Sequence, residues 1–138
     1  MITKGIAKYV YLDSTEKYNG EDTGKYTLTV GLSAEEVDKL EGLGVKVRTV
    51  TDKDTGESIR IRKFSTQYKL SDNMIQTVSG EVIGTDFGAG SDVQVLWKTG
   101  KEHPTHGVAT YLTAIKVADE HEPGFKGSNE EISEFLTA

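Results

Sequence analysis

The side chains with the clearest chemical potential lie in residues 57–70, ESIRIRKFSTQYKL. Ile59 and Ile61 alternate there with Arg60 and Arg62, which predicts a strand with a buried apolar face and an exposed cationic face, because successive side chains of a strand point to opposite sides. The basic and aromatic side chains that follow in the same segment are Lys63, Phe64, Tyr68 and Lys69. Cationic groups bind phosphates and aromatic rings stack on unpaired bases. The segment therefore predicts a surface that binds a single-stranded nucleic acid.

The distribution of charge along the chain supports this interpretation, although the formal net charge of the 138 residues is −6. Residues 117–138 contain six acidic residues and one basic residue. Residues 42–70 contain seven basic and three acidic residues, so this part is cationic while the end of the chain is anionic. The negative total is therefore compatible with a local surface that attracts a polyanion.

Composition excludes several classes of site. The chain has no cysteine, which removes disulfides, thiolate zinc sites and cysteine nucleophiles. No apolar run reaches the roughly 18 residues of a membrane helix, and the opening MITKGIAKYVYLD does not resemble a signal peptide because Lys8 interrupts it. We expect one domain that stays in the cytoplasm in which it is made.

Hydrophobic periodicity predicts about seven strands and one short helix. The helix begins after Ser33, which with Glu36 forms a capping box, and ends at Gly42 or Gly44. The expected strands are residues 6–12 (with a bulge or a strand end near Lys8), 25–30, 45–50, the cationic segment, 76–83, 93–98 and 107–117. This order predicts an all-β barrel or sandwich.

The strand at 45–50 should form a hairpin with the cationic strand, because the turn-forming segment TDKDTGE joins them. Lys46 and Arg48 would then share one basic strip with Arg60 and Arg62. Residues 118–138 have low hydrophobicity and high negative charge, and we interpret them as a mobile acidic tail behind a domain at 1–117.

Sites for metals and catalysis are poorly supported. His103 and His106 stand in the turn-rich segment HPTH, and His121 is a third imidazole, but a solvated loop explains them better than a metal site. The DKDTGE segment lacks the closing glutamate of a calcium loop. There is no glycine-rich phosphate loop and no catalytic triad in a suitable context. We therefore predict no metal, no cofactor and no enzymatic activity.

The chain as a whole resembles the phage-encoded single-stranded DNA-binding proteins of the oligonucleotide/oligosaccharide-binding (OB) fold. The motifs that carry the resemblance occur in order across residues 5–136: GIAKYVYLD, GKYTLTV before the capped helix, IRIRKF, and the pair GAGSDVQVLWK and GVATYLTAIKV before an acidic tail with an aromatic residue. The resemblance implies an OB-fold-like closed or partly open five-stranded barrel with additional strands and a flexible acidic C-terminal tail.

The implied function is the binding of single-stranded DNA in a cationic groove with stacking aromatics. The predicted nucleic-acid-binding residues are Tyr9, Tyr11, Lys46, Arg48, Arg60, Arg62, Lys63, Phe64, Tyr68, Trp97, Lys98 and Tyr111. The tail is implied to recruit replication proteins or to occupy the groove when DNA is absent, and its predicted contact residues are Glu130, Glu131, Glu134 and Phe135. In some relatives the last residue of the tail is aromatic, whereas here Phe135 is followed by Leu-Thr-Ala.

Alternatives remain open at the level of the sequence. Arg60 and Arg62 also fit a solvated strand face whose charge discourages pairing with another edge. Trp97 shares its parity with Val93 and Val95, which fits a core position. The preferred hypothesis is a bacteriophage protein that coats unwound DNA with little sequence preference during replication, recombination or repair in the host cytoplasm. RNA as a ligand and a homodimer stay open. The alternative from another class is a non-enzymatic structural β-sandwich protein of a virion.

Overall fold

A computed structural model describes residues 1–18, 20–52, 55–105 and 107–121. Residues 122–138 lie outside this part, and with them the predicted tail contacts at Glu130, Glu131, Glu134 and Phe135. The acidic tail is therefore a prediction from the sequence alone.

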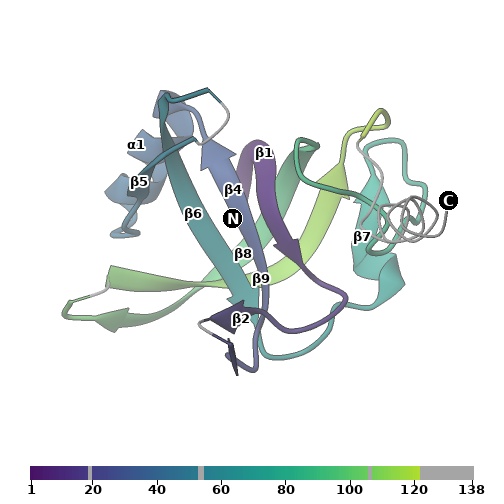
Figure 1. Ribbon diagram of the computed structural model, residues 1–138, viewed down its shortest axis with the longest axis horizontal. Helices are drawn as coiled ribbons and strands as arrows, with labels where there is room; N and C mark the ends of the chain where they lie inside the picture. Colours follow the sequence, from purple (N-terminus) through teal and green to yellow (C-terminus); the bar gives the residue numbers. More distant parts are fainter. Residues whose placement is uncertain (19, 53–54, 106, 122–138) are drawn as a thin grey trace, which may run out of the picture.

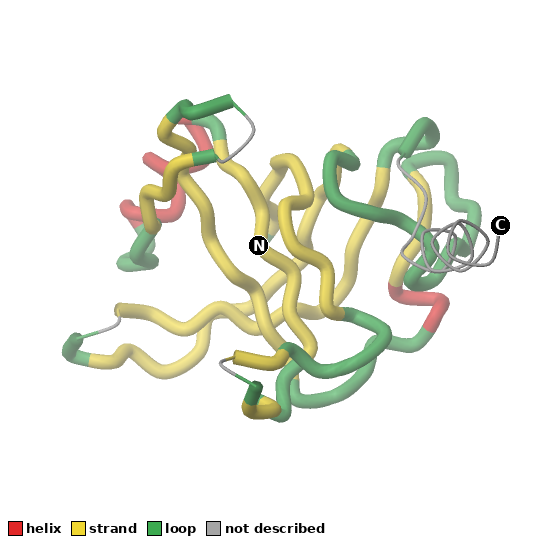
Figure 2. The backbone as a smooth tube through the Cα atoms, viewed as in Figure 1, coloured by secondary structure: helices red, strands yellow, loops and turns green. Residues whose placement is uncertain are grey.

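Five long strands form a ring, which Figures 1 and 2 show from the side. They are β1 (Ile2–Tyr11), β4 (Tyr26–Leu32), β6 (Ser58–Thr66), β8 (Asp92–His103) and β9 (Gly107–Val117). Each pairs with the next in the order β1-β4-β6-β9-β8 and β8 pairs with β1 again, so no strand of the ring lacks a neighbour on either side. Between β6 and β9 the pairing is a single parallel bridge, Ser65 with Tyr111.

Smaller elements extend the ring. Strand β5 (Arg48–Thr51) pairs with β6, β7 (Ile75–Thr77) pairs with β9, and β2 (Lys17–Tyr18) pairs with β3 (Glu21–Asp22) in a separate two-stranded sheet. A 3-10 turn (Asp72–Met74) precedes β7. The predicted hairpin of β5 and β6 is confirmed, whereas the strand predicted at 76–83 is reduced to β7, because residues 78–80 leave it in a turn. The far part of the β8–β9 hairpin projects beyond the ring (Figure 1).

The one α-helix among the described residues, α1 (Ala34–Gly42), has the ends that the sequence predicts. Ser33 Oγ accepts a hydrogen bond from the N–H of Glu36 at 3.3 Å. Gly44 adopts a φ of +83°, a conformation that favours glycine, just after the helix. Val37 and Leu40 are buried, so the predicted apolar stripe fixes the helix to the ring.

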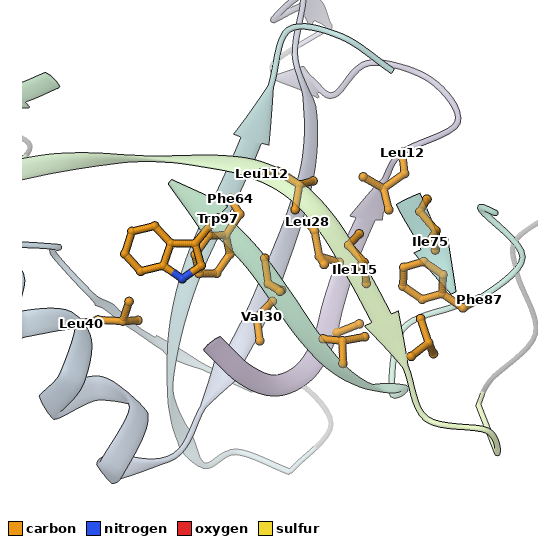
Figure 3. Packing of buried hydrophobic residues seen from close by; sticks show 14 of the residues in the cluster. Leu12, Leu28, Val30, Leu40, Phe64, Ile75, Phe87, Trp97, Leu112 and Ile115 are labelled. Atoms are coloured by element: carbon orange, nitrogen blue, oxygen red, sulfur yellow. The ribbon is translucent and has the colours of Figure 1, made fainter. Parts of the chain in front are cut away.

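The core lies inside the ring, and Figure 3 shows its main side chains. Phe64 and Trp97 pack together there with ring centroids 5.7 Å apart and an angle of 48° between the planes. The indole Nε1 of Trp97 donates a hydrogen bond to Thr3 Oγ1 at 2.8 Å, which joins β8 to β1. The buried cluster comprises Ala7, Leu12, Leu28, Val30, Leu40, Val45, Phe64, Ile75, Phe87, Val93, Val95, Trp97, Leu112, Ile115 and Val117.

Candidate functional site

The outward face of β1, β4 and β6 carries the polar and aromatic groups of the candidate site. In the register of the sheet Tyr9 stands opposite Thr29, which stands opposite Lys63. Residues paired across strands point to the same side, so these three side chains form one row. The next row begins at Tyr11 and continues over Thr27, Ser65 and Tyr111. Of the two alternatives expected near Lys8, a bulge or a strand end, the structure has the bulge, since the register of β1 against β4 shifts between Ala7 and Tyr9.

A cleft of about 280 Å³ lies on this outward face, and we call it the cationic cleft. It is lined by Tyr9, Tyr11, Glu16, Lys17, Thr29, Lys46, Arg48, Ile61, Arg62 and Lys63. Five of these side chains are basic, two are tyrosines and one is acidic. Tyr9 is 55% exposed and Tyr11 is 38% exposed, so both rings are accessible to a planar ligand.

Arg62 is held rigidly at the rim of the cationic cleft. Its Nε donates to Thr110 Oγ1 at 3.1 Å, and its Nη1 and Nη2 donate to the carbonyls of Lys46 and Val108 at 3.1 and 3.3 Å. Burial lowers the pKa of the Arg62 guanidinium from its ordinary value, but an arginine stays charged in proteins. Thr110 Oγ1 donates in turn to the carbonyl of Lys63 at 3.1 Å. The guanidinium is therefore a fixed cation.

Lys46 and Arg48 supply the charge on the β5 side. Lys46 Nζ donates to the carbonyl of Thr105, so it bridges from the start of the β5 segment to the β8–β9 connection. Arg48 is exposed and stands opposite Ile61 in the register of β5 and β6. Arg48 therefore lies on the same side of the hairpin as the lining residue Ile61, and Lys46 lines the same cleft.

Lys63 makes an ion pair with Glu16, the one acidic side chain among the described residues that line the cleft. Its Nζ lies 2.6 Å from Oε1 of Glu16, and Oε2 of Glu16 accepts a hydrogen bond from Thr27 Oγ1 at 3.1 Å. Glu16 is 8% exposed, whereas the side chain of Lys63 is 45% exposed. The cleft thus contains a nearly buried carboxylate beside a cation that solvent reaches.

The predicted basic strip is wrong in one respect, because the strand alternates the other way round. Arg62 stands opposite the buried Val30, so Arg60, Arg62 and Phe64 belong to the inward side of β6. Arg60 stands opposite Thr49, while Arg48 stands opposite Ile61, which places the two arginines on opposite faces of the hairpin. Arg60 Nη1 pairs with Glu41 Oε1 of α1 at 3.4 Å, away from the cationic cleft. Arg62 reaches the cleft only because it lies at the rim.

Phe64 and Trp97 also need correction. Phe64 is 0% exposed and Trp97 is 1% exposed, and both pack inside the ring. Rings in this position have no face free for a base, so the prediction that they stack on nucleic acid is wrong and the core interpretation of Trp97 holds. The aromatic groups of the cleft come from tyrosines, whose hydroxyl groups tolerate contact with water.

Three further predicted residues are exposed but do not line the cationic cleft. Tyr111 is 50% exposed and stands opposite both Ser65 and Lys98. Its ring lies over Gly100, where an added Cβ atom would clash with Tyr111 Cε2. Tyr68 is 79% exposed in the turn after β6. Tyr111 and Lys98 therefore extend the tyrosine row beyond the cleft, and Tyr68 stands apart from it.

Sequence reasoning did not identify Glu16, Lys17 and Thr29 as part of the site. Glu16 and Lys17 lie in the polar segment between β1 and β4, and Glu16 meets Lys63 across 47 positions of sequence. Thr29 lies on β4 with the parity opposite to the core residues Leu28 and Val30, which is the only signal that the sequence offered. Lys17 and Glu16 carried no such signal.

Among the described residues no group of three or more histidine, cysteine, aspartate or glutamate side chains is placed to hold a metal ion. His106 lies outside those residues, so this statement covers His103 and His121 but not His106. In the same part of the chain no helix has the length and apolar character needed to cross a membrane.

Comparison with known proteins identifies the fold. No model of a protein family matches the chain, and no curated protein sequence matches it significantly. The single-stranded DNA-binding protein from bacteriophage Enc34 in complex with ssDNA matches at a TM-score of 0.58 and 13% identity, over 88% of this chain and 86% of that chain. A C-terminal truncation of the Enc34 protein matches at a TM-score of 0.55 and 12% identity, over 88% and 85%. The predicted OB-fold-like architecture, with its likeness to phage single-stranded DNA-binding proteins, is thereby confirmed at the level of the fold.

Proposed function

We propose that the protein binds single-stranded DNA in the cationic cleft. The observation that carries this proposal is that two exposed tyrosines and five basic side chains, Arg62 among them at the rim, line one cleft on the outward face of an OB-type ring. Tyrosine rings stack on unpaired bases, and a groove of cations follows the phosphates between them. Neither group alone selects a nucleic acid, but their combination in one cleft fits a strand with unpaired bases.

The cations and the tyrosine rings of the cleft bind different parts of the DNA strand. Lys46, Arg48 and Arg62 lie on the β5 and β9 side of the cleft and neutralise phosphates, while Tyr9 and Tyr11 on β1 receive bases. Stacking contributes about 1–3 kcal/mol per base and tolerates any sequence, since every base has a π-face. We therefore expect little sequence preference among short oligonucleotides.

The proposed cellular role is supported by the fold and by the charge distribution of the sequence. We propose a non-enzymatic phage protein that coats unwound DNA during replication, recombination or repair inside the infected host. The acidic residues beyond Val117 would contact replication proteins and compete with DNA for the cationic cleft, because their charge is opposite to that of the cleft. Removal of residues 118–138 should then tighten DNA binding at low salt, and unchanged affinity would contradict the competition.

The test is a titration of a fluorescently labelled oligo-dT with the full chain, read by anisotropy over a series of salt concentrations. Arg48→Gln removes one phosphate contact, so its affinity should fall about fivefold at 0.1 M salt and its logarithmic salt slope should become shallower by about 0.7. Lys39→Gln is the matched control, because Lys39 lies on α1 with a side chain that is 61% exposed and pairs with Glu35.

Equal losses in the Arg48→Gln and Lys39→Gln proteins would show that only the overall charge matters and would contradict the cleft as the binding site. If neither the wild-type chain nor a chain without residues 118–138 binds oligo-dT at low salt, the proposed function is refuted. Binding of oligo-rU as tight as that of oligo-dT would widen the ligand class to RNA.

A further inference from the structure

The segment between β1 and β4 places one carboxylate inside the cationic cleft with unusual rigidity. The N–H of Glu16 donates to the carbonyl of Lys25 at 2.8 Å, and its own carbonyl accepts from the N–H and Oγ1 of Thr23 at 2.9 and 2.7 Å. Its side chain is held by Thr27 and by Lys63. Both backbone polar groups and both carboxylate oxygens of Glu16 thus have partners, so the carboxylate cannot swing out of the cleft without losing several of them.

The position of this carboxylate changes what Lys63 offers to a ligand. Among the described residues that line the cleft Glu16 is the only acid, and its contact with Lys63 Nζ at 2.6 Å leaves a pair with no net charge. A phosphate that approached Lys63 would also approach the carboxylate, and like charges at short range repel strongly where solvent is partly excluded. Lys46, Arg48 and Arg62 have no acidic partner among the contacts of the described residues.

We propose that Glu16 is an internal counter-ion that excludes phosphate from Lys63 and so determines where the DNA backbone lies in the cleft. The inference rests on the proposed function and deepens it. Phosphates are directed to the end of the cleft that holds Lys46, Arg48 and Arg62, and the end that holds Glu16 and the tyrosines is left to the bases. The presence of Glu16 also makes the binding weaker and less dependent on salt than the number of cations suggests, because a cation already paired with a carboxylate releases no counterion.

The experiment removes the charge and keeps the shape. In Glu16→Gln the amide oxygen still accepts from Thr27, while Lys63 becomes available to a phosphate. Affinity for labelled oligo-dT should rise about fivefold at 0.1 M salt, and the logarithmic salt slope should steepen by about 0.7, which is the contribution of one added phosphate contact. Glu21→Gln is the matched control, since Glu21 is an exposed acid in the same segment and its replacement changes the net charge by the same amount.

A second variant tests the same point with a neutral exchange. Glu16→Gln/Lys63→Gln removes the pair as a unit, so its affinity and salt slope should match those of the wild type within twofold, whereas Arg48→Gln loses a full contact. This variant leaves neither member of the Glu16–Lys63 pair as a lone charge, and a thermal denaturation curve tests whether it folds. It therefore remains informative if the single substitution perturbs the segment.

The outcomes separate the inference from the function on which it rests. The inference alone is overturned if Glu16→Gln still binds DNA, but with the affinity and the logarithmic salt slope of the wild type or of Glu21→Gln. Weaker binding by Glu16→Gln, or a salt slope of the double variant that is shallower by about 0.7, would also overturn it, because Lys63 would then already contact a phosphate. Absence of binding by all variants and by the wild type would instead refute the proposed function and the inference together.

Discussion

Two groups of aromatic side chains lie on opposite sides of the same sheet, and they differ in their exposure to solvent. On the inward side Val10, Leu28 and Phe64 form a row across β1, β4 and β6, and Trp97 packs against Phe64. On the outward side the adjoining rows begin with Tyr9 and Tyr11. A shift of one position along a strand therefore decides whether a ring stabilises the fold or is available to a ligand.

The difference teaches that the aromatic content of this protein does not by itself indicate its binding surface. Phe64 and Trp97 are fully buried, so their apolar area contributes to folding. Tyr9 and Tyr11 keep 55% and 38% of their surface in solvent, beside cations that attract a polyanion. Substitutions on the two sides should accordingly separate stability from DNA affinity.

The largest effect is expected on the inward side. Phe64→Ala should lower the free energy of unfolding by about 3–5 kcal/mol, because a cavity replaces a ring in contact with Trp97. Urea denaturation followed by circular dichroism measures this loss. Tyr9→Ala is the outward comparison and should cost less than about 1 kcal/mol of stability. Similar losses from both substitutions would contradict the division between the two sides.

The hydrogen bond of Trp97 provides a finer test of the same side. Thr3→Val keeps the shape of Thr3 but leaves the buried indole N–H without its acceptor, so unfolding should become easier by about 1–3 kcal/mol. Affinity for oligo-dT should stay unchanged. Thr99→Val, at an exposed position of β8, is the control for both measurements. A change of DNA affinity in Thr3→Val alone would indicate that Trp97 is coupled to the cleft.

On the outward side the expected loss is one of binding. Tyr9→Ala should weaken binding of oligo-dT by about 1–2 kcal/mol, because one stacking ring is removed. Tyr68→Ala is the matched control, because Tyr68 is a tyrosine that is 79% exposed outside the cationic cleft, so the affinity of this variant should equal that of the wild type.

The native fluorescence of Trp97 should respond little to DNA, since its ring is buried. Strong quenching by stacking would place Trp97 on the outward side after all.

The smallest effect concerns an exposed carboxylate outside both groups. Asp119 Oδ1 accepts hydrogen bonds from Ser79 Oγ and from the Ser79 N–H at 2.7 and 3.2 Å, and these bonds lower the pKa of Asp119 below its ordinary value of 3.8. A carboxyl group with a lowered folded pKa stabilises the protein above the unfolded pKa and loses this contribution as the pH falls through the folded pKa. The difference in melting temperature between wild type and Asp119→Asn should therefore shrink below pH 3.8, and a difference that is constant with pH would contradict the role of these hydrogen bonds.

Much of the fold could be predicted because its signals are local. The capping box at Ser33, the alternation in residues 57–64 and the turn before the cationic strand each depend on neighbours in sequence, and the structure confirms the corresponding elements. The parity of Trp97 with Val93 and Val95 also fitted the core position that the structure shows, although Trp97 was predicted to bind nucleic acid.

The orientation of the cationic strand could not be predicted in the same way. Alternation defines two faces, but the pairing of Arg62 with Val30, far away in sequence, decides which face is inward. Phe64 shares its parity with Arg60 and Arg62 and was a signal against the chosen orientation. The contact of Glu16 with Lys63 had no local signal at all, because it arises from the path of the segment between β1 and β4.

The pairing of β1 with β8 has a consequence for how the chain reaches its folded state. Ile2 stands opposite Leu96, and Thr3 is joined to Trp97 across 94 positions of sequence. During synthesis β1 therefore cannot form its backbone hydrogen bonds with β8 until most of the chain has been made. Contacts of this separation make folding slow, on a scale of milliseconds to seconds. Until then the N–H and C=O groups along the edge of β1 that faces β8 stay unpaired, and an unpaired strand edge makes an incomplete chain prone to aggregation.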